Sequence, residues 1–297
     1  MELLSECPIC KTNKFAPFLK CEDFTVSHET FQLVECPECH LVITNPRPNA
    51  SEIARYYQSE NYISHSNSSK GVSNFIYQTV RKIAIRGKVA LIEGLNKNPK
   101  IILDYGCGTG EFLNAMKKRG WNCKGIETST KARQMAINNY ALVVNEPKVL
   151  PTLHPFEFNV ITMWHVLEHV HDLNQTILEL NRSLAINGFM IIAIPNREAW
   201  DTNYYQQNWA AYDVPRHLYH FSQANVTRFF SNIGFQLKAV KPMFFDPFYI
   251  ALLSEKYKNG KTNYFNAILN GIRTTRAGKK DITKNSSLIY IFQKVVS

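Results

Sequence analysis

The chain has 297 residues, a formal net charge of +10 and seven cysteines. Hydrophobic residues make up 45% of it and charged residues 20%, which is typical of a packed globular protein and excludes a disordered or fibrous chain. This length suits one large domain with a small additional module. An odd number of cysteines, with four in two Cys-x-x-Cys pairs, favours a reducing compartment and a metal site over a disulfide framework, so we expect a cytoplasmic protein.

The sequence carries no signal for export or membrane insertion. Its first residues do not combine a basic segment with an apolar run, so we expect no secretory signal. The most apolar later stretch, Met243 to Leu253, contains Asp246 and Pro247 and is shorter than the roughly 20 residues that a spanning helix requires. We therefore expect no transmembrane helix.

Two Cys-x-x-Cys pairs lie near the N-terminus. Each pair can place two thiolates about 2.3 Å from a tetrahedral zinc ion. Four thiolates form a closed site, so we predict a structural zinc ribbon whose metal compensates for a small core. Cys21 and His40 are alternative donors. The predicted ligands are Cys7, Cys10, Cys36 and Cys39.

A polar region with recurring tyrosines follows the ribbon. Asn45-Pro46-Arg47-Pro48 is a turn-forming run, so we place the end of the ribbon module, residues 1–48, at this point. Residues 49–97 are predicted to form a linker and lid, followed by one or two helices, because apolar residues recur there at helical spacing. Tyr57 and Tyr62 are candidate substrate-binding residues of the lid, with core packing as the alternative.

Residues 98–297 alternate between short apolar runs and helical stretches. This alternation predicts an α/β domain in which parallel strands are joined by crossover helices. Two last apolar runs predict closing strands, and the segment between them, about 243–286, is a predicted insertion. The predicted strands are 101–105, 123–127, 141–144, 158–163, 189–194, 234–240 and 288–292, and the main helices are 112–119, 129–138, 174–184 and 223–232.

A glycine-rich turn follows the first of these strands. In Asp104-Tyr105-Gly106-Cys107-Gly108-Thr109-Gly110 the glycines permit a tight turn and let a ligand approach the backbone, next to the unpaired N–H groups of a helix N-terminus. A dinucleotide site would place its third glycine at position 111, which is Glu111. Carboxylates at Asp104 and Glu111 would also repel a pyrophosphate. The pattern therefore favours a ligand without phosphate.

S-adenosylmethionine is such a ligand. Its ammonium group can be attracted by Asp104, directly or through water. Glu127 ends the second predicted strand, where an acid can accept hydrogen bonds from both ribose hydroxyls, as in related nucleotide-binding folds. Two separate features thus predict the same cofactor.

With these motifs the chain resembles the class I methyltransferases, in particular the branch with ubiquinone-biosynthesis O-methyltransferases and sugar C-methyltransferases. The resemblance spans roughly residues 72–295. It is carried by Asp104 to Gly110, by Gly125-Ile126-Glu127-Thr128, and by the run from Phe158 to Val170. The family usually has aspartate where this chain has Asn159.

The resemblance implies a Rossmann-like α/β fold: a seven-stranded, mostly parallel sheet with its last strand antiparallel and helices on both faces, here with the small N-terminal zinc ribbon added. It implies a cofactor over the ends of the first, second and fourth strands. The cofactor-binding residues it implies are Asp104, Gly106, Cys107, Gly108, Gly110, Glu127, Thr128, Met163, Trp164 and His165.

Histidines cluster in two segments that the resemblance places around the acceptor. A base is needed if the acceptor must lose a proton, and histidine suits that task. Each single histidine has a structural role as its alternative, so the prediction concerns the group. Arg216 can pair with an acidic acceptor or with a nearby carboxylate, and His217 is also a candidate substrate-binding residue. The candidate catalytic residues are His165, His169, His217 and His220.

The run from His165 to His169 also matches H-x-x-E-H, a signature of zinc peptidases. In that signature one helix face presents two metal ligands and an acid. Here the run follows directly on a predicted strand, and the methyltransferase family commonly carries a similar Leu-Glu-His at this place. We therefore favour the methyltransferase interpretation.

The predicted function is methyl transfer from S-adenosylmethionine to oxygen or carbon of a small molecule or a saccharide-linked intermediate. An RNA methyltransferase is the main alternative, because some ribosomal-RNA methyltransferases join a zinc ribbon to this fold and the pI is about 9.2. The second alternative function is that of a non-catalytic, zinc-dependent binding protein. The basic tract from Lys256 to Lys284 can contact RNA, a membrane surface or neither. The oligomeric state is not predicted.

Overall fold

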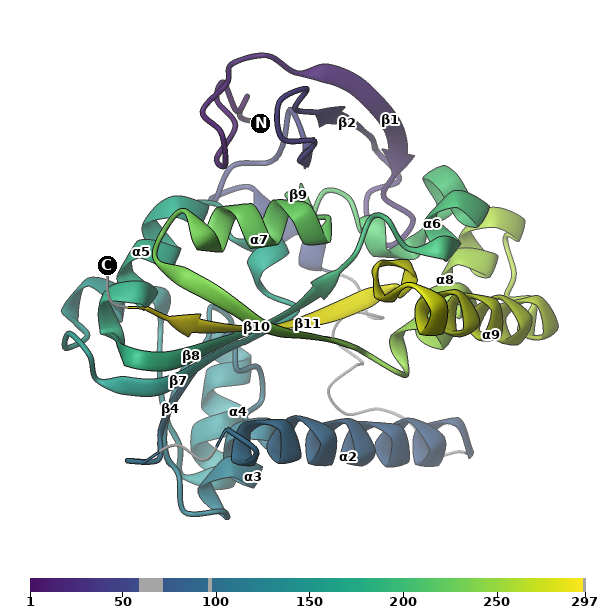
Figure 1. The fold of residues 1–297 in the computed structure, drawn as a ribbon. Helices are drawn as coiled ribbons and strands as arrows, with labels where there is room; N and C mark the ends of the chain where they lie inside the picture. The colour runs from purple at the N-terminus through teal and green to yellow at the C-terminus, as the bar shows by residue number, and fades with distance from the viewer. Residues whose placement is uncertain (59–71, 96–97, 296–297) are drawn as a thin grey trace.

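The computed structural model describes residues 1–58, 72–95 and 98–295 (Figure 1). Its main body is a seven-stranded sheet in the order β10-β11-β8-β7-β4-β5-β6. These strands are β4 (Ile101–Tyr105), β5 (Asn122–Ile126), β6 (Val143–Asn145), β7 (Phe158–Trp164), β8 (Leu184–Pro195), β10 (Phe235–Pro242) and β11 (Ser287–Lys294).

Strand direction in this sheet follows the predicted pattern. Neighbours from β6 through β5, β4 and β7 to β8 pair in parallel. The last strand, β11, is antiparallel both to β8 and to β10. The expectation of a mostly parallel, seven-stranded Rossmann-like sheet with an antiparallel last strand is confirmed.

Helices cover both faces of the sheet (Figure 1). On one face α5 (Leu173–Ser183) and α7 (Gln223–Ser231) pack on a core that includes Leu103 and Ile161. Residues that neighbour these in the strands, such as Ile102 and Val160, point to the other face and pack with apolar residues of three helices. Those helices are α2 (Val72–Glu93), α3 (Glu111–Lys117) and α4 (Thr130–Tyr140). Alternation along each strand therefore builds two apolar layers around one sheet.

The N-terminal segment forms a second sheet that is not separate from the main domain. Its strands are β1 (Ala16–Glu22), β2 (Thr30–Glu35) and β3 (Val42–Thr44), and a fourth, β9 (Tyr219–His220), comes from the main domain. In the β3–β9 pair Val42 lies opposite His220 and Ile43 opposite Tyr219. Leu41 and Ile43 belong to the same buried cluster as the α5 and α7 side chains. The boundary near residue 48 stays a prediction, but core and sheet continue across it.

The predicted insertion forms an antiparallel pair of helices, α8 (Asp246–Asn259) and α9 (Tyr264–Lys280), beside the sheet (Figure 1). The remaining helices are short. Tyr264 and Phe265 at the start of α9 are 70% and 76% exposed. Contact of this insertion with RNA or a membrane stays a prediction. The short helices are η1 (Ile53–Tyr57), η2 (Pro147–Thr152), η3 (Leu167–His169), α6 (Trp200–Tyr205), η4 (Gln206–Asn208), η5 (Ala210–Tyr212) and η6 (Ile282–Lys284).

None of the helices in the described part of the chain combines the length and the apolar character needed to cross a membrane.

Candidate functional site

The glycine turn joins β4 to α3, and all three of its glycines have left-handed backbone conformations. A Cβ added at Gly106 would lie 2.3 Å from a methyl group of Val166, and one added at Gly110 would lie 2.8 Å from the Cβ of Ala136. These two positions require glycine because neighbouring side chains fill the space. At Gly108, where φ is +55°, no atom lies within 4 Å of the added Cβ. The backbone at Gly108 is therefore open to a ligand.

Glu127 lies immediately after β5, beside this turn. Its Oε2 accepts a hydrogen bond from the backbone N–H of Gly108 at 2.8 Å, and its Oε1 accepts one from Ser129, also at 2.8 Å. The two bonds fix the carboxylate at the tip of the strand. Thr128 follows, and its carbonyl accepts a bond from Arg133 at 2.8 Å.

Asp104 lies at the end of β4 and is 2% exposed. The Thr162 hydroxyl donates to its Oδ1 at 2.6 Å. Burial raises the pKa of Asp104 to about 7, although the hydrogen bond from Thr162 and the charge of Lys88 oppose the rise. The turn is therefore flanked by two carboxylates, from two neighbouring strands.

Lys88 is a site residue that the sequence analysis missed. It comes from α2, its ammonium lies 4.4 Å from the centre of the Trp164 ring, and burial lowers its pKa. The signal was present, because Lys88 falls between Ile85 and Ile92 on the apolar stripe of an amphipathic helix. A lysine at such a position indicates a buried negative partner.

The side chains at the end of β7 divide between the core and the site. Met163 is fully buried in the main core, so only its backbone is available to a ligand. Trp164 packs edge-on against Phe112 with ring centres 5.5 Å apart. Cys107 is buried in the turn, and burial raises the pKa of its thiol.

His165, directly after β7, lies between two carboxylates. Its Nε2 is 3.1 Å from Asp246 Oδ2 and its Nδ1 is 3.4 Å from Glu168 Oε1. Burial alone would lower the pKa of His165, but the hydrogen bond and charge of Asp246, assisted by Glu168, raise it to about 10. The ring is thus a cation at neutral pH and cannot accept a proton there.

His169 and His217 pack edge to face, with ring centres 4.6 Å apart. Nδ1 of His169 lies 2.9 Å from the Arg216 carbonyl and 3.1 Å from the Tyr57 hydroxyl. Nδ1 of His217 lies 2.8 Å from the Ala211 carbonyl. Burial and the charge of His217 lower the pKa of His169 to about 4. Because a carbonyl only accepts, each Nδ1 carries a proton, so Nε2 is the only nitrogen of either ring that can offer a lone pair.

The other predicted acceptor-site residues either lie in the ribbon sheet or already bind neighbouring side chains. His220, on β9, is buried with its Nε2 3.1 Å from the Thr44 hydroxyl. Arg216 is 1% exposed and donates to Asp23 Oδ1 at 2.9 Å and to Asp213 Oδ1 at 2.7 Å. Of the two roles considered for Arg216, the structure shows pairing with nearby carboxylates. Tyr62 lies outside the described residues.

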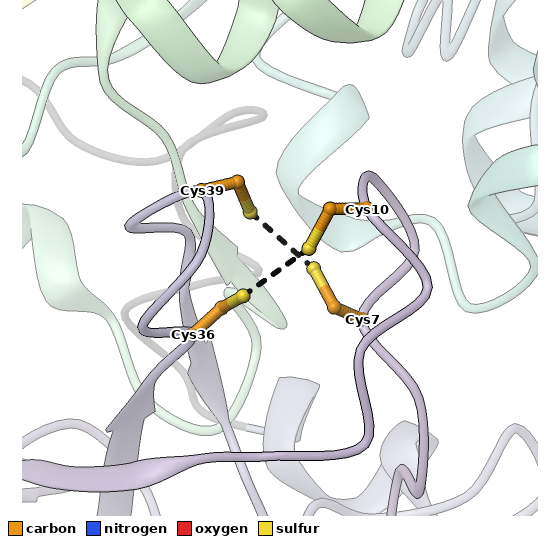
Figure 2. Close-up of side chains that lie close together, drawn as sticks. All are labelled: Cys7, Cys10, Cys36 and Cys39. Carbon is orange, nitrogen blue, oxygen red and sulfur yellow. Dashed lines mark hydrogen bonds between the residues drawn. The ribbon is translucent and has the colours of Figure 1, made fainter.

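The four predicted zinc ligands converge at one point (Figure 2). Cys7 and Cys39 sulfurs are 3.5 Å apart, and those of Cys10 and Cys36 are 3.3 Å apart. Tetrahedral zinc with bonds of about 2.3 Å places sulfurs about 3.8 Å apart, so a small adjustment would seat the ion. The Cys39 thiol, donating to Cys7, lowers the pKa of Cys7 to about 5. Both features fit a thiolate metal site.

The alternative donors do not join this group. Cys21 is buried at the end of β1 among aromatic side chains, and burial raises the pKa of its thiol to about 12. Nδ1 of His40 lies 3.4 Å from Glu35 Oε1. The predicted set of four cysteines is therefore the one that the fold brings together.

Comparisons with known proteins support this interpretation of the fold. A methyltransferase domain family model matches residues 77–240. The ubiquinone biosynthesis O-methyltransferase of Thiobacillus denitrificans is 33% identical over 109 residues, which are 34% of this chain and 46% of that protein. The enzyme of the same name from Cupriavidus pinatubonensis is 25% identical over 163 residues, or 50% and 65% of the two chains. The chain thus spans about half the length of the curated relatives it matches.

Solved structures show the same fold. A methyltransferase from Archaeoglobus fulgidus that depends on S-adenosylmethionine aligns with 75% of this chain and 100% of its own, with a TM-score of 0.51 at 16% identity. The fold is therefore that of the class I methyltransferases. Since the family model covers more than half of the sequence, the chain belongs to the methyltransferase domain family.

Proposed function

We propose that this protein transfers the methyl group of S-adenosylmethionine to oxygen or carbon of a small-molecule or saccharide-linked acceptor. The observation that carries the proposal is the open backbone at Gly108, flanked by Asp104 and Glu127. These groups suit a phosphate-free nucleoside with an ammonium group and a ribose diol. The relatives named as ubiquinone biosynthesis O-methyltransferases support oxygen as the acceptor atom.

The residues that would hold the cofactor come from the ends of two neighbouring strands, β4 and β5. Glu127 would accept the ribose hydroxyls, Asp104 would attract the ammonium, and Gly108 would allow close approach of the ligand. When bound, S-adenosylmethionine supplies an electrophilic methyl group, and the acceptor must lie in line behind it. The bond from sulfur to the methyl carbon breaks as the bond to the acceptor forms, leaving the demethylated thioether as product.

His169 and His217 are the pocket histidines best suited to take the acceptor's proton. Each directs Nδ1 to a backbone carbonyl and leaves Nε2 as the nitrogen that can take a proton, whereas the carboxylates beside His165 raise its pKa to about 10. His220 bonds to Thr44 in the ribbon sheet instead. We also propose that the four cysteines bind a structural zinc ion, because their sulfurs form a closed set with no position left for a substrate.

Calorimetry with purified protein tests the proposal. S-adenosylmethionine and its demethylated product should bind, and Glu127→Gln should weaken binding about 10- to 100-fold, since a hydrogen bond to a charged group contributes about 1.5–3 kcal/mol. Glu6→Gln is the matched control, because that carboxylate is exposed on the ribbon and pairs with Lys11. Absence of binding, together with binding of a nicotinamide dinucleotide, would overturn the proposal.

A screen with labelled S-adenosylmethionine tests the acceptor class. Incubated with cell extract, the protein should label small molecules or glycan-linked material. Label that enters RNA alone would instead favour the zinc-ribbon RNA methyltransferase. Cofactor binding without transfer to any fraction would favour a non-catalytic binding protein.

The raised pKa of Asp104 predicts a pH dependence of cofactor binding. With a pKa of about 7 the carboxyl is largely neutral at pH 6 and ionised at pH 8. Only the ionised form attracts the cofactor's ammonium, so affinity should rise several-fold as the pH increases from 5.5 to 7. The groups that act on Asp104 are Lys88, Thr162 and Glu127.

Asp104→Asn is the control for this pH effect. The amide keeps the shape of the side chain and cannot ionise, so calorimetry between pH 5.5 and 7 should show weak binding that barely changes with pH. Equal pH dependence in this variant and the unaltered protein would show that another group is responsible.

A further inference from the structure

Glu168, His169 and His217 form a second cluster of potential metal ligands, separate from the four cysteines. One donor atom from each residue lies within 4.8 Å of the other two. Glu168 and His169 belong to η3, directly after the site strand β7, and His217 lies on the loop before β9. We infer that these three side chains bind a divalent transition-metal ion, such as zinc, in the acceptor pocket.

Both histidines have the orientation that a metal ligand requires. Each Nδ1 donates to a backbone carbonyl, from Arg216 for His169 and from Ala211 for His217. Metal-binding histidines commonly hold one ring nitrogen this way, which directs the lone pair of the other nitrogen at the ion. The backbone bond from Leu218 N–H to the Glu168 carbonyl, at 2.8 Å, ties the loop of His217 to η3. The fold thus holds two imidazole rings beside the Glu168 carboxylate, and Nε2 of His217 also lies 3.9 Å from Asp213 Oδ2.

Glu168 supplies the second, independent observation. Its side chain is 1% exposed, and within the residues that the structure describes neither carboxylate oxygen accepts a hydrogen bond. The His165 ring forms an ion pair with this carboxylate, with Nδ1 3.4 Å from Oε1. A buried carboxylate usually accepts several hydrogen bonds or binds a metal. Because Oε1 faces His165, a cation between Glu168 and the two histidines would supply a partner for Oε2.

The set of donors indicates the class of ion. Two imidazoles and one carboxylate suit zinc and its first-row neighbours, and they leave coordination positions open for another ligand. Bonds of about 2.0–2.2 Å at tetrahedral angles place ligand atoms about 3.3 Å apart, so the group must contract slightly around the ion.

The role of the ion rests on the proposed function. An acceptor hydroxyl bound at an open position would lose its proton more readily, because a metal ion lowers the pKa of bound oxygen groups. With the ion bound, His169 and His217 would hold it in place of acting as the base, and the acceptor's proton would pass to solvent water. The binding site itself does not depend on this role.

Metal analysis of the purified full-length protein tests the inference. After growth with zinc and dialysis against metal-free buffer, the protein should hold about two zinc ions per chain, one for each predicted site. Glu168→Gln and His217→Gln should each reduce the content to about one. His154→Gln is the matched control, since His154 is exposed and outside the cluster, and it should keep both. A single ion in the unaltered protein, or unchanged content in both variants, would overturn the inference.

Cobalt substitution separates the two sites by their spectra. Cobalt bound to four thiolates gives intense sulfur-to-metal charge-transfer bands, whereas cobalt at nitrogen and oxygen ligands gives only weak visible bands. The weak bands should disappear in Glu168→Gln while the thiolate bands persist, which also shows that the variant is folded. If Glu168→Gln keeps both the weak bands and the thiolate bands, Glu168 does not bind the second ion and the proposed site is wrong.

Calorimetry with S-adenosylmethionine keeps this test apart from that of the proposed function. If the protein binds two metal ions but no S-adenosylmethionine, the metal site stands and the proposed function fails. If it binds the cofactor but holds an ion only at the cysteines, the proposed function stands and the metal site at Glu168 fails.

Discussion

Replacement of Arg216 by leucine is expected to lower the free energy of unfolding by about 3–5 kcal/mol, enough to threaten the folded state. Arg216 is a buried charge that joins the N-terminal ribbon to the main domain through several hydrogen bonds. Besides its bonds to Asp23 and Asp213, its Nη1 donates to the Tyr56 carbonyl at 2.8 Å. Leucine would leave the fully buried Asp23 carboxylate without its cation, which is far more costly than losing an exposed ion pair.

Chemical denaturation measures this loss. Arg228→Leu, an exposed position on α7, is the matched control and should change the unfolding free energy by less than about 0.5 kcal/mol. Arg216→Lys should fall between the two, because an ammonium keeps the charge but not the planar fork of donors. Equal stability of Arg216→Leu and the control would show that the pairing contributes nothing.

The same ion pair gives a pH dependence with a defined sign. Burial would raise the pKa of Asp23, but the hydrogen bond and charge of Arg216 bring it down to about 2. Because the folded pKa is below the usual value, Asp23 contributes stability that is complete above about pH 4. That stability should be lost as the pH falls towards 2. In Arg216→Leu, where the guanidinium no longer offsets burial, this part of the acid dependence should shrink or reverse.

The main sheet could be predicted from the sequence because its signals are local. Short apolar runs such as Ile101 to Tyr105, separated by helical stretches, already define a doubly wound sheet. The two-residue strand β9 could not be predicted, because Tyr219 and His220 carry no strand pattern and pair with β3 across most of the chain. Its pairing is what joins the ribbon to the main domain.

The candidate site divides in a similar way. The glycine turn and Glu127 could be predicted, because a strand, a turn and a helix fix their place from neighbouring residues alone. The protonation state of each histidine could not be predicted. Asp246, from the insertion, raises the pKa of His165, whereas burial and the charge of His217, from a distant loop, lower the pKa of His169. Both depend on contacts between segments far apart in the sequence.

Loss of the predicted zinc ion is expected to have the largest effect on the fold. Structural zinc sites in small peptides contribute about 10–16 kcal/mol of apparent binding free energy, so the ribbon should not stay folded without metal. Here the damage should spread, because Cys7 and Cys36 are fully buried in the same cluster as Leu103 and Phe229. Unfolding of the ribbon would expose that cluster and remove the strand that pairs with β9.

Thermal unfolding of Cys36→Ala, or of the protein treated with a chelator, measures this effect. Its midpoint should fall by more than about 10 °C, since several kcal/mol are lost and each kcal/mol shifts a domain of this size by about 2–4 °C. Cys21→Ala is the matched control, because Cys21 is a buried ribbon cysteine outside the ligand set. It should keep its metal and lose only the packing of one small side chain. If both variants melt alike and hold equal zinc, the four cysteines do not bind a structural ion, and the ribbon must be held by the core and β9 alone.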